Sequence, residues 1–465
     1  MPGQGLDQPA ESVGTPVRSA GLSARAIRRA EGLGSLPALQ RVLYRSAKQD
    51  PMRRFHALYD KVARSDVMWQ AWIDVCTNRG APGVDGVSID DVAADGVSGV
   101  RAYLEALADN LRAGTYRPLP LRRVHIPKPG QSGKTRPLGI PTVRDRIVMA
   151  ATKLVLEPIF EADFLPVSYG FRPKRSAQQA VEVIRVEANR GREWVLDGDV
   201  TDCFGSIDHD ALMARVANRV SDRRMLKLIR AWLRAGVLEN GVVTDTVSGT
   251  PQGSPVSPLL ANVALSVLDE DWRDHSGQLG VLVRFADDFV VLCATKARAE
   301  AARQRVITIL GRLGLRLHPD KTRIVHLAGG GQGFDFLGFH HHKVASWKRP
   351  GRYYLQRWPS DRAIASIRAK VRDRTDRRLV GWPVEEIVAR LNPMLRGWGN
   401  YFRWGNSGRK FATIDRYVNE RLAIFASTKH GLRGRNWATR FSYTWYQGLG
   451  VYQLSGKVRY RTAHA

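Results

Sequence analysis

The sequence predicts an α+β protein, in which short apolar strands carrying acidic residues lie between long helical segments. The clearest strands are the two halves of residues 281–294, VLVRFA and FVVLCA, which flank Asp287 and Asp288. Runs of this length, rich in Val, Leu and Phe, are typical of buried strands. A further strand, WVLDGDV, begins at Trp194 and also ends in carboxylates.

The adjacent acids between the two apolar runs suggest a metal site. Neighbouring carboxylates repel one another, and burying them uncompensated is costly. A divalent cation would remove both costs, and Mg²⁺ prefers hard oxygen ligands shared between carboxylates and phosphates. An ordinary β-turn is the alternative, because Asp is a favoured turn residue.

The composition indicates a partner with many negative charges. The chain has 465 residues and is 43% hydrophobic, enough for two to four domains. Its 72 Lys and Arg against 44 Asp and Glu give a net charge of +28. This excess predicts binding to a polyanion, although a ribosome-like structural protein or a membrane-surface protein would share it. The 12 Trp and 13 Tyr offer stacking surfaces for single-stranded nucleic acid.

The cysteines and the apolar runs exclude several classes of protein. Cys76, Cys203 and Cys293 are far apart and form no CxxC pair, which argues against a zinc ribbon or a disulfide framework. No apolar run approaches the roughly 18 residues of a membrane span. The first residues lack the apolar centre of a signal peptide. We therefore expect a cytoplasmic protein without a membrane partner.

The N-terminal third reads as a basic arm followed by helices. Residues 1–35 are rich in Gly, Ser, Ala and Pro, which predicts disorder. Phe55, Leu58, Tyr59 and Val62 have helical spacing, and further helices are expected at 100–113, 142–160 and 176–189. Residues 80–86, GAPGVDG, form either a plain loop or a close approach to a phosphate.

Residues 121–141 predict a basic hairpin. Its strand-like halves, RRVHIP and TRPLGIP, surround a Pro/Gly/Lys loop. Arg123, Lys128, Lys134 and Arg136 place cations on one flap, which suits a triphosphate or a nucleic-acid backbone. A merely solvated hairpin is the alternative.

A second acidic cluster follows Trp194. Side chains alternate along a strand, so Asp197 and Asp199 share a face that Val200 opposes. Either acid could join Asp287 around a metal, whereas solvated turn acids are the alternative reading. Phe204 lies close enough to wall the same pocket, unless it is an ordinary core residue.

Three shorter segments between 249 and 342 add binding groups. The polar turn GTPQGSP at 249–255 can present the Gln252 amide to a base or ribose, and helices are expected at 259–268 and 297–313. Lys321 lies in a turn, and FDFLGF at 334–339 predicts a short aromatic strand. His340, His341 and His342 cannot all face one metal from a strand, which favours an exposed edge facing nucleic acid over a zinc site.

The C-terminal region is helical, basic and aromatic. Helices are expected at 363–379, 391–404 and 411–425, the second with a break at Gly397 and Gly399. A helical bundle with all its Trp residues in the core is the alternative to an RNA-binding role. We expect several Trp residues in the core and a cationic face that binds RNA.

Six ordered motifs carry a resemblance. They are RPLGIP, SYGFRP, DVTDCFGSIDH, TPQGSPVSPLLAN, FADD and FDFLGF. In this order, over about residues 50–445, the sequence resembles the reverse transcriptases encoded by group II introns. LNPMLRGWGNYFRW resembles the maturase-specific, RNA-binding thumb of the same family.

The resemblance implies a right-hand polymerase with fingers, an antiparallel-sheet palm and a helical thumb. The expected divisions are a helical extension with the start of the fingers at 36–120, fingers and palm at 121–345, thumb at 346–445 and a tail at 446–465. Asp199, Asp287 and Asp288 match the catalytic acids.

The same resemblance assigns cofactors and binding residues. It implies two Mg²⁺ ions, with Mn²⁺ as an alternative, held by Asp199, Val200, Asp287 and Asp288. Phe204 matches the aromatic gate against a ribose 2′-hydroxyl, Arg136 and Gln252 match positions near the incoming nucleotide, and Lys321 matches a lysine near its phosphates. The expected RNA-binding residues are Lys128, Arg172, Arg396, Trp398 and Arg403.

The sequence departs from the family pattern at three points. Phe285 stands where a tyrosine is usual, and Ser254 replaces a common glycine. No zinc-ligand-rich endonuclease module follows the thumb, so we expect the protein not to cleave target DNA itself. Retargeting would then rely on the intron RNA and on pre-existing nicks or forks.

The expected function is that of an RNA-directed DNA polymerase that binds its intron RNA, assists splicing and makes cDNA during retrohoming. Its partners would be group II intron RNA, RNA template, DNA primer, target DNA and dNTPs, with the protein a monomer or dimer. One alternative is a maturase that only binds RNA and keeps vestigial acids. Another is a reverse transcriptase recruited to host defence or CRISPR adaptation.

Overall fold

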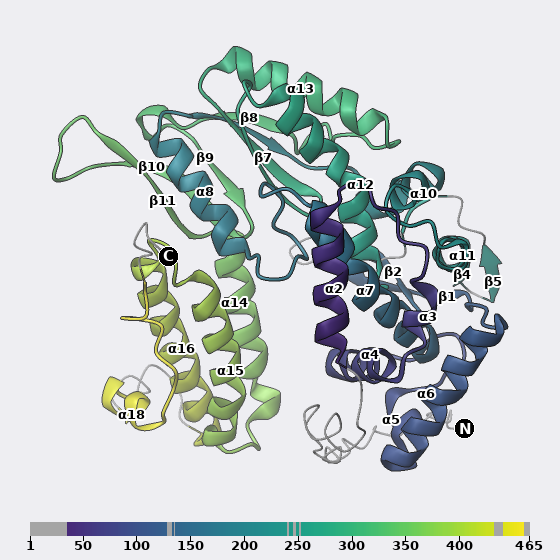
Figure 1. The fold of residues 1–465 in the computed structure, drawn as a ribbon. Helices are drawn as coiled ribbons and strands as arrows, with labels where there is room; N and C mark the ends of the chain where they lie inside the picture. Colours follow the sequence, from purple (N-terminus) through teal and green to yellow (C-terminus); the bar gives the residue numbers. More distant parts are fainter. Residues whose placement is uncertain are drawn as a thin grey trace, which may run out of the picture.

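Three β-sheets connect two groups of helices (Figure 1). The computed structural model describes residues 35–127, 133, 135–239, 241–244, 248–250, 253–431 and 440–459. In Figure 1 the N-terminal helices, in purple and blue, lie on the opposite side of the molecule from the green and yellow C-terminal helices. The expected disordered arm falls almost entirely outside the described residues.

The N-terminal helices pack around α7, the long buried helix Val143–Asp163. They are α2 Leu36–Gln49, α3 Tyr59–Val62, α4 Ser65–Asn78, α5 Ile89–Ala93 and α6 Gly96–Ala113. One expectation is wrong here: Phe55 is not helical. It forms an isolated bridge with Val220 instead, so only the second half of the predicted helix exists.

The predicted basic hairpin is present and belongs to a four-stranded sheet. β1 Leu121–Pro127 pairs antiparallel with β2 Thr135–Ile140. β1 also pairs in parallel with β4 Val237–Glu239, which pairs with β5 Val242–Thr244. Lys128 and Lys134 lie outside the described residues.

The central sheet is antiparallel, in the order β6-β7-β3-β8. Its strands are β6 Val281–Phe285, β7 Asp288–Cys293, β3 Trp194–Gly198 and β8 Arg323–His326. Alternate side chains enter two different cores: Leu196 and Val291 join one hydrophobic cluster, and Val195 and Val290 join the other. Burial of both faces explains why these strands are continuously apolar.

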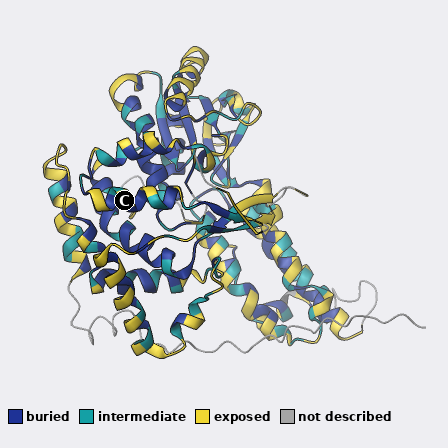
Figure 2. Ribbon diagram, turned by 90° about the vertical axis from the view of Figure 1, so that its right-hand side faces the viewer, coloured by how far each residue is buried: buried dark blue, intermediate teal, exposed yellow. Residues whose placement is uncertain are grey.

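Helices cover both faces of the central sheet. α8 Ala177–Asn189 packs on β6 and β7, and α13 Lys296–Gly311 packs on β3 and β7. The other helices of this region are α9 Cys203–Ser206, α10 His209–Ala217, α11 Arg223–Leu233, α12 Ser257–Asp271 and the π-helical turn Trp272–Ser276. Figure 2 shows buried residues gathered where helices meet the sheets and exposed residues on outward helix faces. The alternating pattern fixes which strand face each helix covers.

The third sheet, in the order β11-β10-β9, leads into the C-terminal helices. Its strands are β9 Gly333–Phe336, β10 Phe339–Ala345 and β11 Tyr353–Pro359. FDFLGF was expected to be one strand, but Leu337 and Gly338 have positive φ and turn the chain between β9 and β10. A two-residue turn of this kind produces a tight hairpin.

The C-terminal helices are α14 Asp361–Arg374, α15 Val384–Phe402, α16 Gly408–Lys429 and α18 Tyr443–Gly448, with a short 3₁₀ turn at 377–379. Another 3₁₀ turn, 328–330, precedes β9. The predicted break at Gly397 and Gly399 is wrong, because α15 is continuous through both. A Cβ atom at position 399 would lie 2.6 Å from a Leu454 methyl carbon. Gly399 therefore permits close packing instead of ending the helix.

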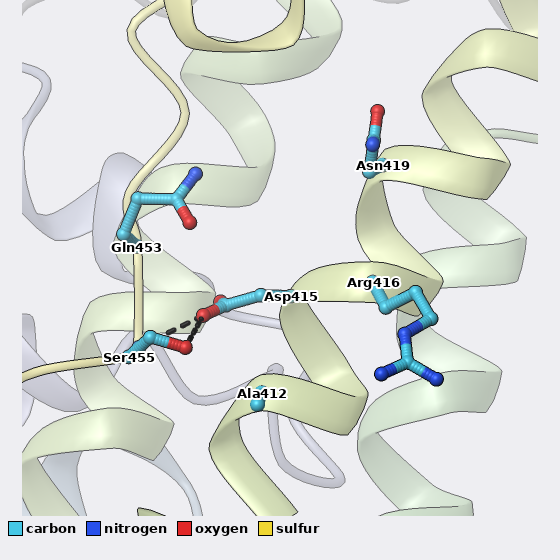
Figure 3. Close-up of a pocket in the computed structure, with 6 residues that line it drawn as sticks. All are labelled: Ala412, Asp415, Arg416, Asn419, Gln453 and Ser455. Atoms are coloured by element: carbon cyan, nitrogen blue, oxygen red, sulfur yellow. Dashed lines mark hydrogen bonds between the residues drawn. The ribbon is translucent and has the colours of Figure 1, made fainter. Parts of the chain in front are cut away.

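The final described segment is fastened to α16 by one carboxylate (Figure 3). Asp415 accepts hydrogen bonds from the main-chain nitrogen of Leu454 at 2.9 Å and from the main-chain nitrogen and hydroxyl of Ser455 at 2.8 and 2.6 Å. Leu454 is fully buried in the hydrophobic cluster that also contains Val195 and Val290. Residues 446–459 thus pack as part of the C-terminal helical unit and are not a free tail.

Among the described helices, none combines the length and the apolarity needed to cross a lipid bilayer.

Candidate active site

The acid pair lies at the tip of the hairpin formed by β6 and β7. Phe285 pairs with Asp288, which leaves Ala286 and Asp287 as the two turn residues. Ala286 has φ +57°, a left-handed conformation of the kind that two-residue hairpins require. The sequence prediction of two strands joined by an acidic turn is confirmed.

The pairing of β3 with β7 brings the third acid to this tip. Leu196 pairs with Val291 and Gly198 with Phe289, so the chain leaves β3 directly beside the start of β7. Asp199 is the next residue, and its carbonyl oxygen accepts a hydrogen bond from the His318 main chain at 2.8 Å. Two segments almost 90 residues apart therefore converge, as the resemblance implied.

The acids influence one another electrostatically. Loss of surrounding water raises the pKa of Asp288 to about 7, and repulsion by Asp287, Asp199 and Asp197 adds to the shift. Desolvation, together with repulsion by Asp199, also raises the pKa of Asp287, which the cations Arg136 and Arg284 partly offset. Such repulsion between neighbouring carboxylates indicates a site suited to a cation.

Asp197 and Asp199 have different positions and different partners. The Asp197 carboxylate pairs with Arg323 at 3.2 Å across the β3–β8 pairing, and burial raises its pKa to about 6. Asp199 lies beyond the strand end and pairs with Lys321, whose Nζ is 2.5 Å from Oδ2. Asp199 is therefore the acid placed at the tip.

The donor set fits a hard divalent cation, although the ligands are not assembled around one. Within the described part of the chain, no group of three or more His, Cys, Asp or Glu side chains has metal-binding geometry. The Lys321 ammonium supplies positive charge to Asp199 instead. Mg²⁺ binds oxygen ligands. The available ligands here are the carboxylate oxygens of Asp199, Asp287 and Asp288 and the main-chain carbonyl oxygen of Val200.

A buried polar cluster that the sequence reasoning missed supports the acidic turn. The Arg284 guanidinium forms a bidentate ion pair with Asp269, at 2.7 and 2.5 Å. It also donates to Asn262 Oδ1 at 3.0 Å and to the Ala286 carbonyl at 2.9 Å. The ion-paired side chains are only 1% and 0% exposed. Arg284 therefore links α12 directly to the turn.

The same cluster ties the SYGFRP motif to the turn. Asn262 donates to the Gly170 carbonyl at 2.8 Å, and residues 167–169 hydrogen-bond with the main chain of Arg284. A Cβ atom at Gly170 would lie 2.4 Å from the Ala286 nitrogen, so only glycine fits. The sequence did contain an indication of this cluster, namely a single arginine inside the apolar run VLVRF. A buried charge requires a partner, so such an arginine predicts a buried acid nearby.

Phe204 lies beside the TPQGSP loop. The Thr250 main chain donates to the Phe204 carbonyl at 2.6 Å, and His209 Nε2 lies 2.7 Å from the Gly249 carbonyl. Gly253 packs against Gly139 of RPLGIP, with φ +109°. The TPQGSP loop thus contacts both the main chain of the half-buried Phe204 and the RPLGIP strand. Gln252 lies outside the described residues.

The expected RNA-binding residues divide into two groups. Arg172 is an error of the sequence reasoning: it is 7% exposed, and all five of its N–H groups donate to Glu161 and to the carbonyls of Phe164, Leu165 and Ser168. It cannot offer a donor to RNA. Lys128 lies outside the described residues.

Of the expected RNA-binding residues in the C-terminal helices, Arg396 and Arg403 can still contact RNA. Arg396 lies over the Tyr452 ring at 5.4 Å and Arg403 over the Trp404 ring at 4.9 Å. Trp398 packs between Phe402 and Phe411, with centroid distances of 4.9 and 5.6 Å. Trp398 therefore contributes to the thumb interior, and RNA contacts by the two arginines stay predictions.

The chain matches two family descriptions. Residues 126–341 match "Reverse transcriptase (RNA-dependent DNA polymerase)", and residues 364–443 match "Group II intron, maturase-specific domain". The first match covers every segment that converges at the acidic turn, and the second lies within the C-terminal helices. The fold and the site thus define a reverse transcriptase.

The relatives specify the branch of this class. Protein YkfC of Escherichia coli (strain K12) is 37% identical over 339 residues, covering 64% of this chain and 86% of YkfC. Group II intron-encoded protein LtrA of Lactococcus lactis subsp. cremoris is 41% identical over 216 residues, covering 46% of this chain and 35% of LtrA. The matched part thus spans most of YkfC and about a third of LtrA. The chain belongs to the family of group II intron-encoded reverse transcriptases and maturases.

Proposed function

We propose that this chain copies RNA into DNA with Asp199, Asp287 and Asp288 as its catalytic acids, and that it binds group II intron RNA and assists its splicing. The observation that carries the proposal is the convergence of Asp199 with the Asp287–Asp288 turn through the pairing of β3 with β7. The cDNA would be made during retrohoming, from a DNA primer and dNTPs.

The acids and the Val200 carbonyl would hold the divalent metals. When bound, two such ions activate the primer 3′-oxygen and neutralise the leaving pyrophosphate. Arg136 and Lys321 supply positive charge to the acids, since Arg136 lowers the pKa of Asp287 and Lys321 lowers that of Asp288. Lys321 can exchange its carboxylate partner for the phosphates of an incoming nucleotide.

We expect the wild-type protein to extend oligo(dT) on poly(rA) in Mg²⁺, with a rate at limiting Mg²⁺ that rises between about pH 6 and pH 8. The pKa of Asp288 is raised to about 7, so below this pH the carboxyl holds a proton and binds metal poorly. Rates should be measured at limiting and saturating Mg²⁺, because saturation should flatten the profile. Absence of extension at every pH would leave only an RNA-binding role.

We also expect Phe204→Val to admit ribonucleotides. The main chain of Phe204 contacts Gly249 and Thr250, and its half-buried ring is the group that the resemblance assigns to the gate. A shorter side chain at this position should leave room for a ribose 2′-hydroxyl. The ratio of dNTP to rNTP incorporation should fall by at least about tenfold, which corresponds to the loss of one steric contact. Tyr44→Val, which removes an exposed aromatic ring from α2, is a matched control for a lost ring. Unchanged selectivity in Phe204→Val would remove the gate assignment.

A further inference from the structure

The hairpin of β10 and β11 projects from the body of the protein (Figure 1). Its connecting loop, residues 346–352, carries Trp347. Trp347 is 87% exposed, a high value for so large an apolar side chain. The connection is closed by defined hydrogen bonds: Ser346 and Arg352 pair through their main chains at 2.8 Å, and the Arg349 nitrogen donates to the Ser346 hydroxyl at 3.1 Å. Trp347 is therefore presented by an ordered turn.

One face of this hairpin carries further aromatic side chains between Trp347 and the body of the protein. His340, His342 and Tyr354 alternate with buried residues, and His340 pairs across the strands with Trp358. The rings of His340 and His342 lie 5.3 and 6.2 Å from the Trp358 ring. His341 points to the other face, where it is fully buried against Phe334. The expectation that the three histidines cannot face one site is confirmed by this alternation. The expected exposed edge is wrong, because β10 is the middle strand of its sheet and His341 is fully buried.

The charges on the hairpin favour a polyanion. Residues 339–359 contain five Lys and Arg and no Asp or Glu. Lys343 and Arg357 are buried and paired with Glu193 and Glu182. By contrast Lys348, Arg349 and Arg352 make no ion pair with any described residue, and the Lys348 ammonium lies 4.9 Å from the Trp347 ring centre. An acid, Asp335 of β9, lies beside the aromatic face and pairs with His340 at 2.7 Å.

We propose that this aromatic hairpin, residues 339–359, is a docking surface for a single-stranded segment of RNA, with an unpaired base stacked on Trp347 and the backbone held by Lys348, Arg349 and Arg352. Stacking platforms flanked by cations are how proteins bind unpaired nucleotides. The hairpin belongs to a different sheet from the acidic turn, and we assign it to a part of the RNA that is not being copied. It depends on the proposed function only in taking RNA as the ligand.

The test compares full-length variants in binding to an unstructured fluorescent RNA and to an RNA duplex of equal length. Trp347→Ala should weaken binding of the single strand by about tenfold and leave duplex binding unchanged, since a duplex offers no unstacked base. Trp347→Phe should restore binding. Tyr44→Ala, which removes an exposed aromatic ring from α2, is the matched control and should change neither affinity.

The salt dependence of binding distinguishes the contribution of the Trp347 ring from that of the three cationic side chains. The triple variant Lys348→Gln, Arg349→Gln, Arg352→Gln should reduce the slope of log affinity against log salt by about 2, whereas Trp347→Ala should leave the slope unchanged. RNA carrying 5-bromouracil should crosslink to Trp347 on irradiation. Equal losses for single strand and duplex, or no loss in Trp347→Ala, would each overturn the proposal.

Primer extension on poly(rA) with oligo(dT) serves as the independent reference. Trp347→Ala should keep the wild-type extension rate, which shows that the variant is folded. A wild-type protein that fails to extend but binds single-stranded RNA through Trp347 would contradict the polymerase proposal and support this one. The reverse result would contradict only the docking surface.

Discussion

Asp287→Ala should reduce primer extension by about 10³-fold or more while leaving RNA affinity within about twofold of the wild type. The side chain lies at the acidic turn, and loss of a metal ligand removes several kcal/mol of transition-state stabilisation. The basic surfaces of the thumb and of the aromatic hairpin are built on other elements, so they should survive. Extension and filter binding to intron RNA should be measured on the same preparation.

The control for this prediction is Asp109→Ala. Asp109 is an exposed acid on α6, paired with Arg112 at 2.7 Å, and its loss removes the same charge far from the turn. We expect it to change neither rate nor affinity. Equal loss of extension and RNA binding in a folded Asp287→Ala protein would show that the two functions share one surface, contrary to the division proposed here.

Arg284→Ala should destabilise the protein by about 3–5 kcal/mol, because it leaves the fully buried Asp269 carboxylate without its partner. The Ala286 carbonyl and Asn262 would also lose their donor. The effect should appear as a large fall in the thermal midpoint together with loss of extension. Arg273→Ala is the matched control: it breaks an exposed bidentate pair with Asp274 and should cost at most about 1 kcal/mol.

A double variant separates stability from positioning. Arg284→Met with Asp269→Leu replaces the buried pair by apolar side chains, which often restores stability. It cannot restore the hydrogen bond from Arg284 to the Ala286 carbonyl, so the turn should remain less well held. We expect recovery of the thermal midpoint with extension still reduced, mainly in kcat. Full recovery of both would assign Arg284 a purely structural role.

Much of the local structure was predictable because it depends on short-range patterns. The apolar runs around Asp287 and Asp288 determine two strands, and the helical periodicities near 143–163 and 408–429 determine two helices. The predicted break at Gly397 and Gly399 failed because a glycine can serve packing as well as flexibility. Only the position of Leu454 in space distinguishes these two uses.

Arg172 shows why RNA-binding residues are hard to predict from the sequence. A basic residue in a turn is equally consistent with RNA contact and with internal capping, and the choice depends on which carbonyl groups surround it. Here Glu161 and three main-chain carbonyls take all of its donors. The same limit hid the partners of Arg284, since Asn262 and Asp269 lie on a separate helix.

The sequence by itself determined the chemistry of this protein: acids between apolar strands, a large positive charge and an ordered set of motifs. The tertiary structure alone decided which of the acids meet, because the register of β3 against β7 places Asp199 at the turn and leaves Asp197 to Arg323. It also decided which cations are free, because the burial of a charged side chain depends on contacts between distant segments. Such contacts depend on how the whole chain packs, and a local sequence pattern does not predict them.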